Sequence, residues 1–151
     1  RELILKENVE QLRDQYEYIL IDCMPSLGVM TINALVAADR VLIPVQAAYL
    51  PVKGLQQLIK TVTVVKKRLN KDLKIEGILI TMVDYRTNYA KDITEMLQDS
   101  YGETVGLMKI YIPFSVKVAE ASAEGSSIYR YAPRCKVTES FENLTREVLA
   151  R

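Results

Sequence analysis

Histidine is absent from this 151-residue chain, and cysteine is scarce. Without histidine the chain cannot build a Ser-His-Asp or Cys-His catalytic site, or a zinc site with histidine ligands. Its two cysteines, Cys23 and Cys135, are far apart in sequence, so they have the spacing of neither a metal motif nor a disulfide framework. We therefore expect reduced thiols and a chemistry that depends on other residue types.

Long apolar runs and an excess of one charge are also missing. No stretch approaches the ~18 apolar residues that span a bilayer, and the first residues lack the layout of a signal peptide. The 20 basic and 19 acidic side chains leave a net charge of +1, so any contact with nucleic acid must come from a local patch. With 49% hydrophobic and 26% charged residues, the composition predicts a single cytoplasmic globular domain over residues 1–151.

Helix and strand patterns alternate along the chain. Apolar residues at helical spacing predict helices over 2–15, 29–38, 53–69, 89–100, 115–123 and 136–150. Apolar runs predict strands over 18–22, 40–45, 75–82 and 105–111. Pro44 places the second of these strands at a sheet edge, or ends it, because proline cannot donate to a ladder. The alternation predicts an α/β domain with a mostly parallel sheet flanked by helices.

The segment YILIDCMPSLGVMTINAL, residues 18–35, carries the strongest functional signal. An apolar strand leads into Asp22, a turn follows, and a helical pattern resumes at Val29. In an open parallel sheet such turns lie at the carboxyl ends of strands, where ligands bind, and an acid there can hold a magnesium-bound water. The alternative is that Asp22 only caps the turn.

These residues and several later segments resemble the ParA/Soj chromosome and plasmid partitioning ATPases of the MinD/ParA superfamily. The matching segments include IDCMPSLG at 21–28, TINAL at 31–35, VLIPVQ at 41–46, GILITM at 77–82, RTN at 86–88, IP at 112–113 and EA at 120–121. The resemblance covers almost the whole chain. It implies a P-loop NTPase fold of the ParA/MinD type.

The resemblance also implies roles for particular residues. Asp22 matches the Walker B acid, which is catalytic and orients magnesium through a water, and the switch turn that senses the nucleotide matches Pro25, Ser26 and Gly28. The other positions implied to contact the nucleotide are Met82, Pro113, Phe114 and Ser115. The family's usual Ile-Pro-Arg-Asn reads Ile-Pro-Phe-Ser here, so Phe114 lacks a positive charge and Ser115 has a shorter side chain. Phe114 is equally well explained as a core residue.

Two basic positions match arginines that bind DNA phosphates in this family, Arg86 and Lys117. Phosphate contacts give affinity without sequence specificity, and that affinity falls with salt. A solvated surface is the alternative explanation for each residue. The denser basic run at residues 66–74 is expected to complement the helix dipole and solvent instead.

A phosphate-binding loop is missing. P-loop ATPases need a glycine-rich loop ending in Gly-Lys-Ser/Thr, whose backbone N–H groups cradle the phosphates. None of the six glycines, at 28, 54, 77, 102, 106 and 125, begins such a loop. In the ParA family this loop precedes the segment that matches residue 1. We therefore expect the chain to be the C-terminal part of such an ATPase, to hold no cofactor itself and not to hydrolyse ATP alone.

For the full-length protein the resemblance implies ATP and Mg²⁺ as cofactors and an ATP-dependent homodimer. It also implies nonspecific DNA and a ParB-like centromere-binding protein as partners, in a bacterial cytoplasm and on the nucleoid. One alternative is a MinD-like membrane-cycling positioning ATPase, and another is a non-catalytic interaction fragment. MinD-type proteins end in a basic amphipathic helix, and residues 146–151 are too acidic and short for one, so no membrane contact is expected.

Strand 18–22 has a further consequence. In the family the P-loop strand lies beside the Walker B strand, so we expect one edge of residues 18–22 to be unpaired in this chain. Exposed apolar edges recruit partners. We therefore expect self-association, exchange of elements or a rearranged N-terminal helix.

Overall fold

The structure is a computed structural model that describes residues 3–24 and 26–151, without the side chains of 49–53. It divides into two compact units. Unit 1 comprises residues 1–41 and 54–75, and unit 2 comprises residues 42–53 and 76–151. The single domain expected from composition stays a prediction.

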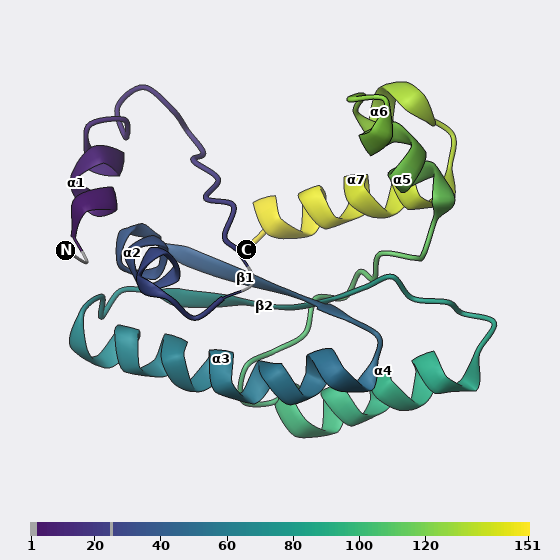
Figure 1. Cartoon of the computed structure of the whole chain (residues 1–151), viewed down its shortest axis with the longest axis horizontal. Helices are drawn as coiled ribbons and strands as arrows, with labels where there is room; N and C mark the ends of the chain where they lie inside the picture. Colours follow the sequence, from purple (N-terminus) through teal and green to yellow (C-terminus); the bar gives the residue numbers. More distant parts are fainter. Residues whose placement is uncertain (1–2, 25) are drawn as a thin grey trace. The chain divides into compact units, whose positions relative to one another are not determined.

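Unit 1 is helical. It contains α1 (Ile4–Glu10), α2 (Val29–Ala37) and the part of α3 (Tyr49–Arg68) that follows Gly54 (Figure 1). Helix α3 forms an apolar stripe because its aliphatic residues recur every three or four positions. The stripe packs against α2 and the following loop in a core of Leu35, Val36, Val62, Val65 and Leu73.

Asn70 ties the end of α3 to the end of α2. Its side-chain Nδ2 lies 3.0, 3.2 and 2.8 Å from the carbonyl oxygens of Leu35, Val36 and Ala38. The last carbonyls of a helix have no partner inside the helix, so this amide satisfies groups that would otherwise be exposed or orphaned. Leu73, three residues further on, is fully buried. The loop after α3 is therefore fixed to the core of unit 1 at two points.

Unit 2 is built around a parallel pair of strands. Strand β1 (Arg40–Gln46) and strand β2 (Lys74–Thr81) form the sheet, and their last residues, from Leu42 and Glu76 onward, belong to this unit (Figure 1). Pro44 is exposed on β1, which confirms the expected edge position. Four helices follow in the chain, namely α4 (Asn88–Tyr101), α5 (Val116–Ala123), α6 (Ile128–Tyr131) and α7 (Lys136–Leu149).

Helices cover both sides of this sheet. Leu79 faces a cluster with Met108, Ile112 and Val137, and the apolar side chains of α7 complete it. Successive residues of a strand point to opposite faces, so Ile78 and Ile80 face the other way. Helix α4 lies on that side, opposite α7 (Figure 1). The expected α/β architecture with flanking helices is confirmed.

The expected strand at 105–111 is replaced by two isolated parallel bridges, Ile78 to Leu107 and Val83 to Pro113. Between the bridges the backbone N–H groups of Lys109 and Ile110 leave the ladder. They donate to the Glu147 carboxylate of α7, at 2.9 and 3.1 Å. A side chain thus takes the donors that a continuous strand would need.

The expected strand at 18–22 is wrong. The backbone there is irregular, and the Leu20 side chain is 94% exposed. A strand needs a ladder partner, and β1 and β2 pair with each other rather than with this segment. The helix expected over 2–15 is shorter, because α1 ends at Glu10 and turns occupy 11–15. Helix α6 was not expected.

We predict that Asn70→Ala destabilises unit 1. Three helix-terminal carbonyls would lose their hydrogen-bond donor, and a buried polar group left without a hydrogen bond lowers the free energy of unfolding by about 1–3 kcal/mol. Urea unfolding followed by circular dichroism should show this loss in the free energy of unfolding. Asn8→Ala is the matched control, because Asn8 is exposed and its amide donates to Ile4 O one turn earlier in the same helix. Equal effects of the two substitutions would contradict the capping role.

Candidate functional site

The Asp22 turn lies directly before α2 in unit 1. Asp22 is exposed, and Ser26 N donates to Met24 O at 2.7 Å within the turn. The buried hydroxyl of Thr31, in the first turn of α2, donates to the carbonyl of Ser26. Pro25 lies outside the described residues. Thr31 therefore fixes the turn to the helix, a role that its place in an apolar helix could have indicated.

Gly28 is the N-cap residue of α2. Its φ of −83° is available to any residue, and an added Cβ would meet only Ser26 Oγ at an ordinary 3.7 Å. In this conformation the turn does not require a glycine. No side-chain hydrogen bond caps α2 among the described residues, so no side chain there satisfies its first backbone N–H groups.

The donor set of this turn suits magnesium and phosphate. Mg²⁺ prefers oxygen ligands and keeps several waters, and the turn offers an exposed carboxylate and a hydroxyl. The uncapped end of α2 adds N–H groups of the kind that bind phosphate. Within 3–24 and 26–151 no cluster of three or more Cys, Asp or Glu could hold a metal by itself. A magnesium ion here would therefore need water or phosphate oxygens as further ligands.

The second group of predicted nucleotide contacts gathers at the carboxyl end of β2, in unit 2. Val83 pairs with Pro113, and Phe114 N donates to Val83 O at 3.0 Å. Met82 has a left-handed φ of 53°, and its sulfur accepts from Gln46 Nε2 at 2.9 Å. The Phe114 side chain is 60% exposed, so the structure does not place it in the core.

Ser115 continues this group as the N-cap residue of α5. Its backbone is extended, and its hydroxyl makes no capping hydrogen bond in the part of the chain that the structure describes. The structure thus brings together four of the predicted residues in unit 2, Met82, Pro113, Phe114 and Ser115. Asp22, Ser26 and Gly28 gather separately in unit 1.

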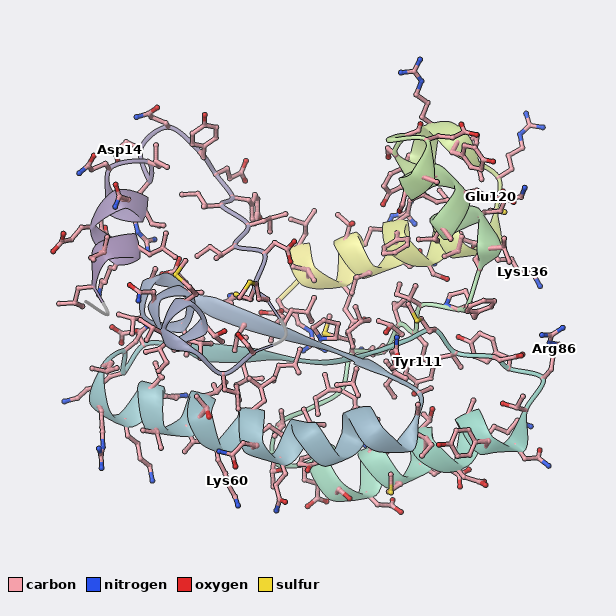
Figure 2. The ribbon with its side chains drawn as sticks, in the orientation of Figure 1. Asp14, Lys60, Arg86, Tyr111, Glu120 and Lys136 are labelled. Carbon is pink, nitrogen blue, oxygen red and sulfur yellow. The ribbon has the colours of Figure 1, made fainter. Side chains whose placement is uncertain are left out.

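Arg86 lies in the loop between β2 and α4 and points outward (Figure 2). Its Nε and Nη2 donate to the two carboxylate oxygens of Asp84 at 2.9 and 2.8 Å, and its backbone N donates to the same carboxylate. These hydrogen bonds lower the pKa of Asp84 to about 2. Thr87 caps α4 by accepting from Ala90 N and donates to Asp84 O. The loop therefore presents the guanidinium in one orientation.

Lys117 lies in the first turn of α5. Its Nζ is 2.8 Å from Glu120 Oε2, which also accepts from the hydroxyl of Tyr131 on α6 at 3.0 Å. The ammonium lies 5.8 Å from the centre of the Tyr131 ring, within cation–π range. Hydrogen bonds from Lys117 and then from Tyr131 lower the pKa of Glu120.

Both predicted DNA-contacting cations are thus paired with an acid of their own segment. Sequence reasoning named Arg86 and Lys117 but gave no role to Asp84 or Glu120. Opposite charges at a spacing of three residues on a helix were the available signal for Glu120. A two-residue spacing in a loop carries no such signal for Asp84.

The chain has structural neighbours among nucleotide-binding proteins. Apo McdA from Cyanothece is similar with a TM-score of 0.84 and 18% identity, over 97% of this chain and 59% of that one. Cobyrinic acid a,c-diamide synthase from Mycobacterium smegmatis, with bound ADP and magnesium, has a TM-score of 0.70 and 35% identity over 77% and 46%. These neighbours define the fold as a P-loop NTPase fold of the ParA/MinD type.

Sequence relatives then narrow this class. The AAA_31 family, an AAA domain, matches residues 1–75. Sporulation initiation inhibitor protein Soj of Bacillus subtilis is 45% identical over 99% of this chain and 58% of its own length. Chromosome-partitioning ATPase Soj of Treponema pallidum is 42% identical over 100% and 59%. The chain belongs to the ParA/Soj family, and it spans less than two thirds of the length of these relatives.

Among the described residues, no helix is both long and apolar enough to span a membrane.

We predict that the Asp84 carboxyl titrates near pH 2 and that Arg86→Ala returns its midpoint to about 4, the ordinary value for aspartate. A lowered pKa means that the Asp84–Arg86 pair stabilises the fold above the ordinary pKa and loses this effect as the pH falls toward 2. Carbon-detected NMR of the side-chain carboxyls measures both midpoints. An unchanged Asp84 midpoint in Arg86→Ala would show that the pair is not formed in solution.

Proposed function

We propose that the chain is part of an ATPase that partitions chromosomes or plasmids, contributing its Walker B turn and its DNA-contacting face. The observation that supports this most is the 45% identity to Soj over nearly all of the chain. In this proposal the full-length protein binds ATP and Mg²⁺, dimerises with ATP and binds DNA nonspecifically. A ParB-like partner at a centromere-like site stimulates it.

Asp22 acts in this proposal by holding a water of the magnesium ion. Its exposed carboxylate sits before a turn that Thr31 fixes to α2, so a change at Ser26 or Gly28 is transmitted to a helix rather than to a free loop. Bound Mg·ATP would supply the phosphoryl group and the charge that orients the attacking water. Met82, Pro113, Phe114 and Ser115 contact the adenine and ribose side.

Arg86 and Lys117 carry the DNA contact in this proposal. Both are exposed in unit 2, with 86% and 50% of the side chain accessible, and both are held in place by an acid. Phosphate recognition by such residues needs charge and reach but no base readout. To bind these cations, a DNA phosphate would have to displace Asp84 from Arg86 and Glu120 from Lys117.

Helix α7 itself does not serve as a membrane-binding helix in this proposal. An amphipathic membrane helix must leave its apolar face free for lipid. In unit 2 that face of α7 is occupied, because Phe141, Leu144 and Val148 pack against the cluster around Leu79.

We predict that the chain binds nonspecific duplex DNA in a salt-dependent way and that Arg86→Ala with Lys117→Ala weakens it. Each phosphate contact contributes about 0.9 to the slope of log affinity against log salt, so the double variant should lose about 1.8 of that slope. Fluorescence anisotropy over a salt series measures affinity and slope together.

The matched control for this experiment is Lys91→Ala with Arg146→Ala, which removes the same charge from α4 and α7 of the same unit. We expect the control to keep most of the affinity. An equal loss in both double variants, or no binding at low salt, would contradict the assignment. Binding to anionic liposomes instead would favour the MinD-like alternative.

We predict that Glu120→Gln strengthens DNA binding at low salt by about twofold or more. The substitution removes the negative charge of Glu120, which competes with DNA phosphate for Lys117. The glutamine keeps an oxygen that can accept from Tyr131. The gain should shrink as salt rises, since salt screens exposed charges. The same anisotropy assay measures it, and weaker binding by Glu120→Gln would show that the pair positions Lys117 for DNA rather than competing with it.

A further inference from the structure

A basic depression of about 400 Å³ lies in unit 1 near the end of α3. We name it the α3-end pocket, and the residues that line it are Asp39, Arg40, Lys66, Lys71, Asp72 and Lys74. Four of these six side chains are positively charged. They come from three segments, so the concentration of charge depends on the fold as well as on the sequence.

One of the two acids of this pocket is already neutralised by a neighbour. Arg13 donates through both Nη atoms to the Asp39 carboxylate, at 3.1 and 2.9 Å. This two-pronged pairing is the strong geometry for a guanidinium and a carboxylate. Arg13 does not line the pocket, so its charge offsets Asp39 from outside and leaves the lining with a positive excess.

The backbone that carries Lys71 and Lys74 is firmly held. Asn70 is fixed to the end of α2, and Leu73 is fully buried between the two lysines. Lys74 N also donates to Asp39 O at 3.0 Å. A ligand would therefore meet cations on an ordered loop, and less ordering of the backbone is needed on binding.

The helix dipole does not explain these two lysines. Lys66, Lys67 and Arg68 occupy the last turn of α3, where cations offset the negative end of the dipole. The dipole effect falls off within that turn. Lys71 and Lys74 follow the end of α3 by three and six residues, beyond this range. The expected complementarity to the dipole therefore applies only to Lys66, Lys67 and Arg68, and the expectation leaves Lys71 and Lys74 to solvent.

We propose that the α3-end pocket binds a compact anion with two or more linked phosphate groups, such as inorganic tripolyphosphate or the phosphate chain of a nucleotide. Lysine ammonium groups bind phosphate as compact charges, and several of them in one depression match several phosphates. The four cations line a single open depression of about 400 Å³, and this local grouping of charge favours a compact anion over the extended backbone of duplex DNA. This proposal is independent of the proposed function, whose DNA-contacting residues belong to unit 2.

The test is isothermal titration calorimetry of the full chain with inorganic tripolyphosphate. Lys71→Gln with Lys74→Gln should weaken binding by about tenfold or more, because hydrogen bonds to charged groups are worth at least this factor. The matched control is Lys60→Gln with Lys67→Gln, two exposed lysines of α3 that do not line the pocket; Lys60 points away from the helix in Figure 2. Equal losses in both double variants would overturn the proposal.

A gain-of-affinity variant guards against simple unfolding. Asp72→Asn removes a negative charge from the lining, so tripolyphosphate should bind several-fold more tightly. ADP and orthophosphate serve as further probes, and the proposal expects ADP to bind and orthophosphate to bind more weakly. The proposal would be overturned if tripolyphosphate did not bind. If duplex DNA bound instead, and Lys71→Gln with Lys74→Gln abolished that binding, the pocket would be a DNA contact.

Discussion

The backbone pairing of β2 on both of its edges is the constraint on which unit 2 depends. One edge pairs with β1, and on the other Met108 N donates to Ile78 O and Ile112 N donates to Ile80 O, at 2.8 and 2.9 Å. Residues 76–80 are buried, so any lost pairing would leave peptide groups without water. Gly77 permits the close approach of this second edge. Its φ is 150°, and a Cβ there would lie 3.1 Å from Met108 Sδ.

The C-terminal helix completes this arrangement through charge. Burial raises the pKa of Glu147, but the Lys109 N–H, Arg151 and the Ile110 N–H outweigh it and lower the pKa overall. The ionised carboxylate thus holds two backbone donors, and Arg151 reaches from it to the carbonyl of Glu76 at the start of β2. These contacts fix α7 to the first half of β2 and to the segment that precedes Pro113.

Much of the fold followed from the sequence because its signals are periodic. The aliphatic stripe of α3 and the apolar run of β2 each extend over several turns or residues, and both elements formed close to where they were expected. The expected strands at 18–22 and 105–111 failed for different reasons. The strands β1 and β2 pair with each other and not with residues 18–22, and at 105–111 the Glu147 carboxylate takes the N–H groups of Lys109 and Ile110. A local pattern contains neither of these distant partners. The site shows the same division. Arg86 and Lys117 were named from the resemblance, and their DNA contacts stay a prediction. Their pairing with Asp84 and Glu120 is shown by the structure.

The pairing of both cations changes what their presence means. An exposed cation without a partner attracts any anion, but Arg86 and Lys117 bind only an anion that displaces the carboxylate already paired with them. The two exchanges are unequal, because Arg86 makes two parallel hydrogen bonds to Asp84 while Lys117 makes one to Glu120. Lys117 is therefore the easier of the two to release, and Arg86 is the better oriented.

The net charge of the whole chain does not show how unevenly charge is distributed along the sequence. Residues 66–74 contain five basic and one acidic side chain, a net charge of +4, so the rest of the chain carries −3 of the total of +1. At physiological salt, screening limits the electrostatic attraction of an anion to charges within about 8 Å. It therefore encounters the local excess at the α3-end pocket and not the nearly neutral total. A near-zero net charge excludes a uniformly basic surface, but it leaves room for a local basic site wherever the fold gathers cations and pairs the nearby acids elsewhere.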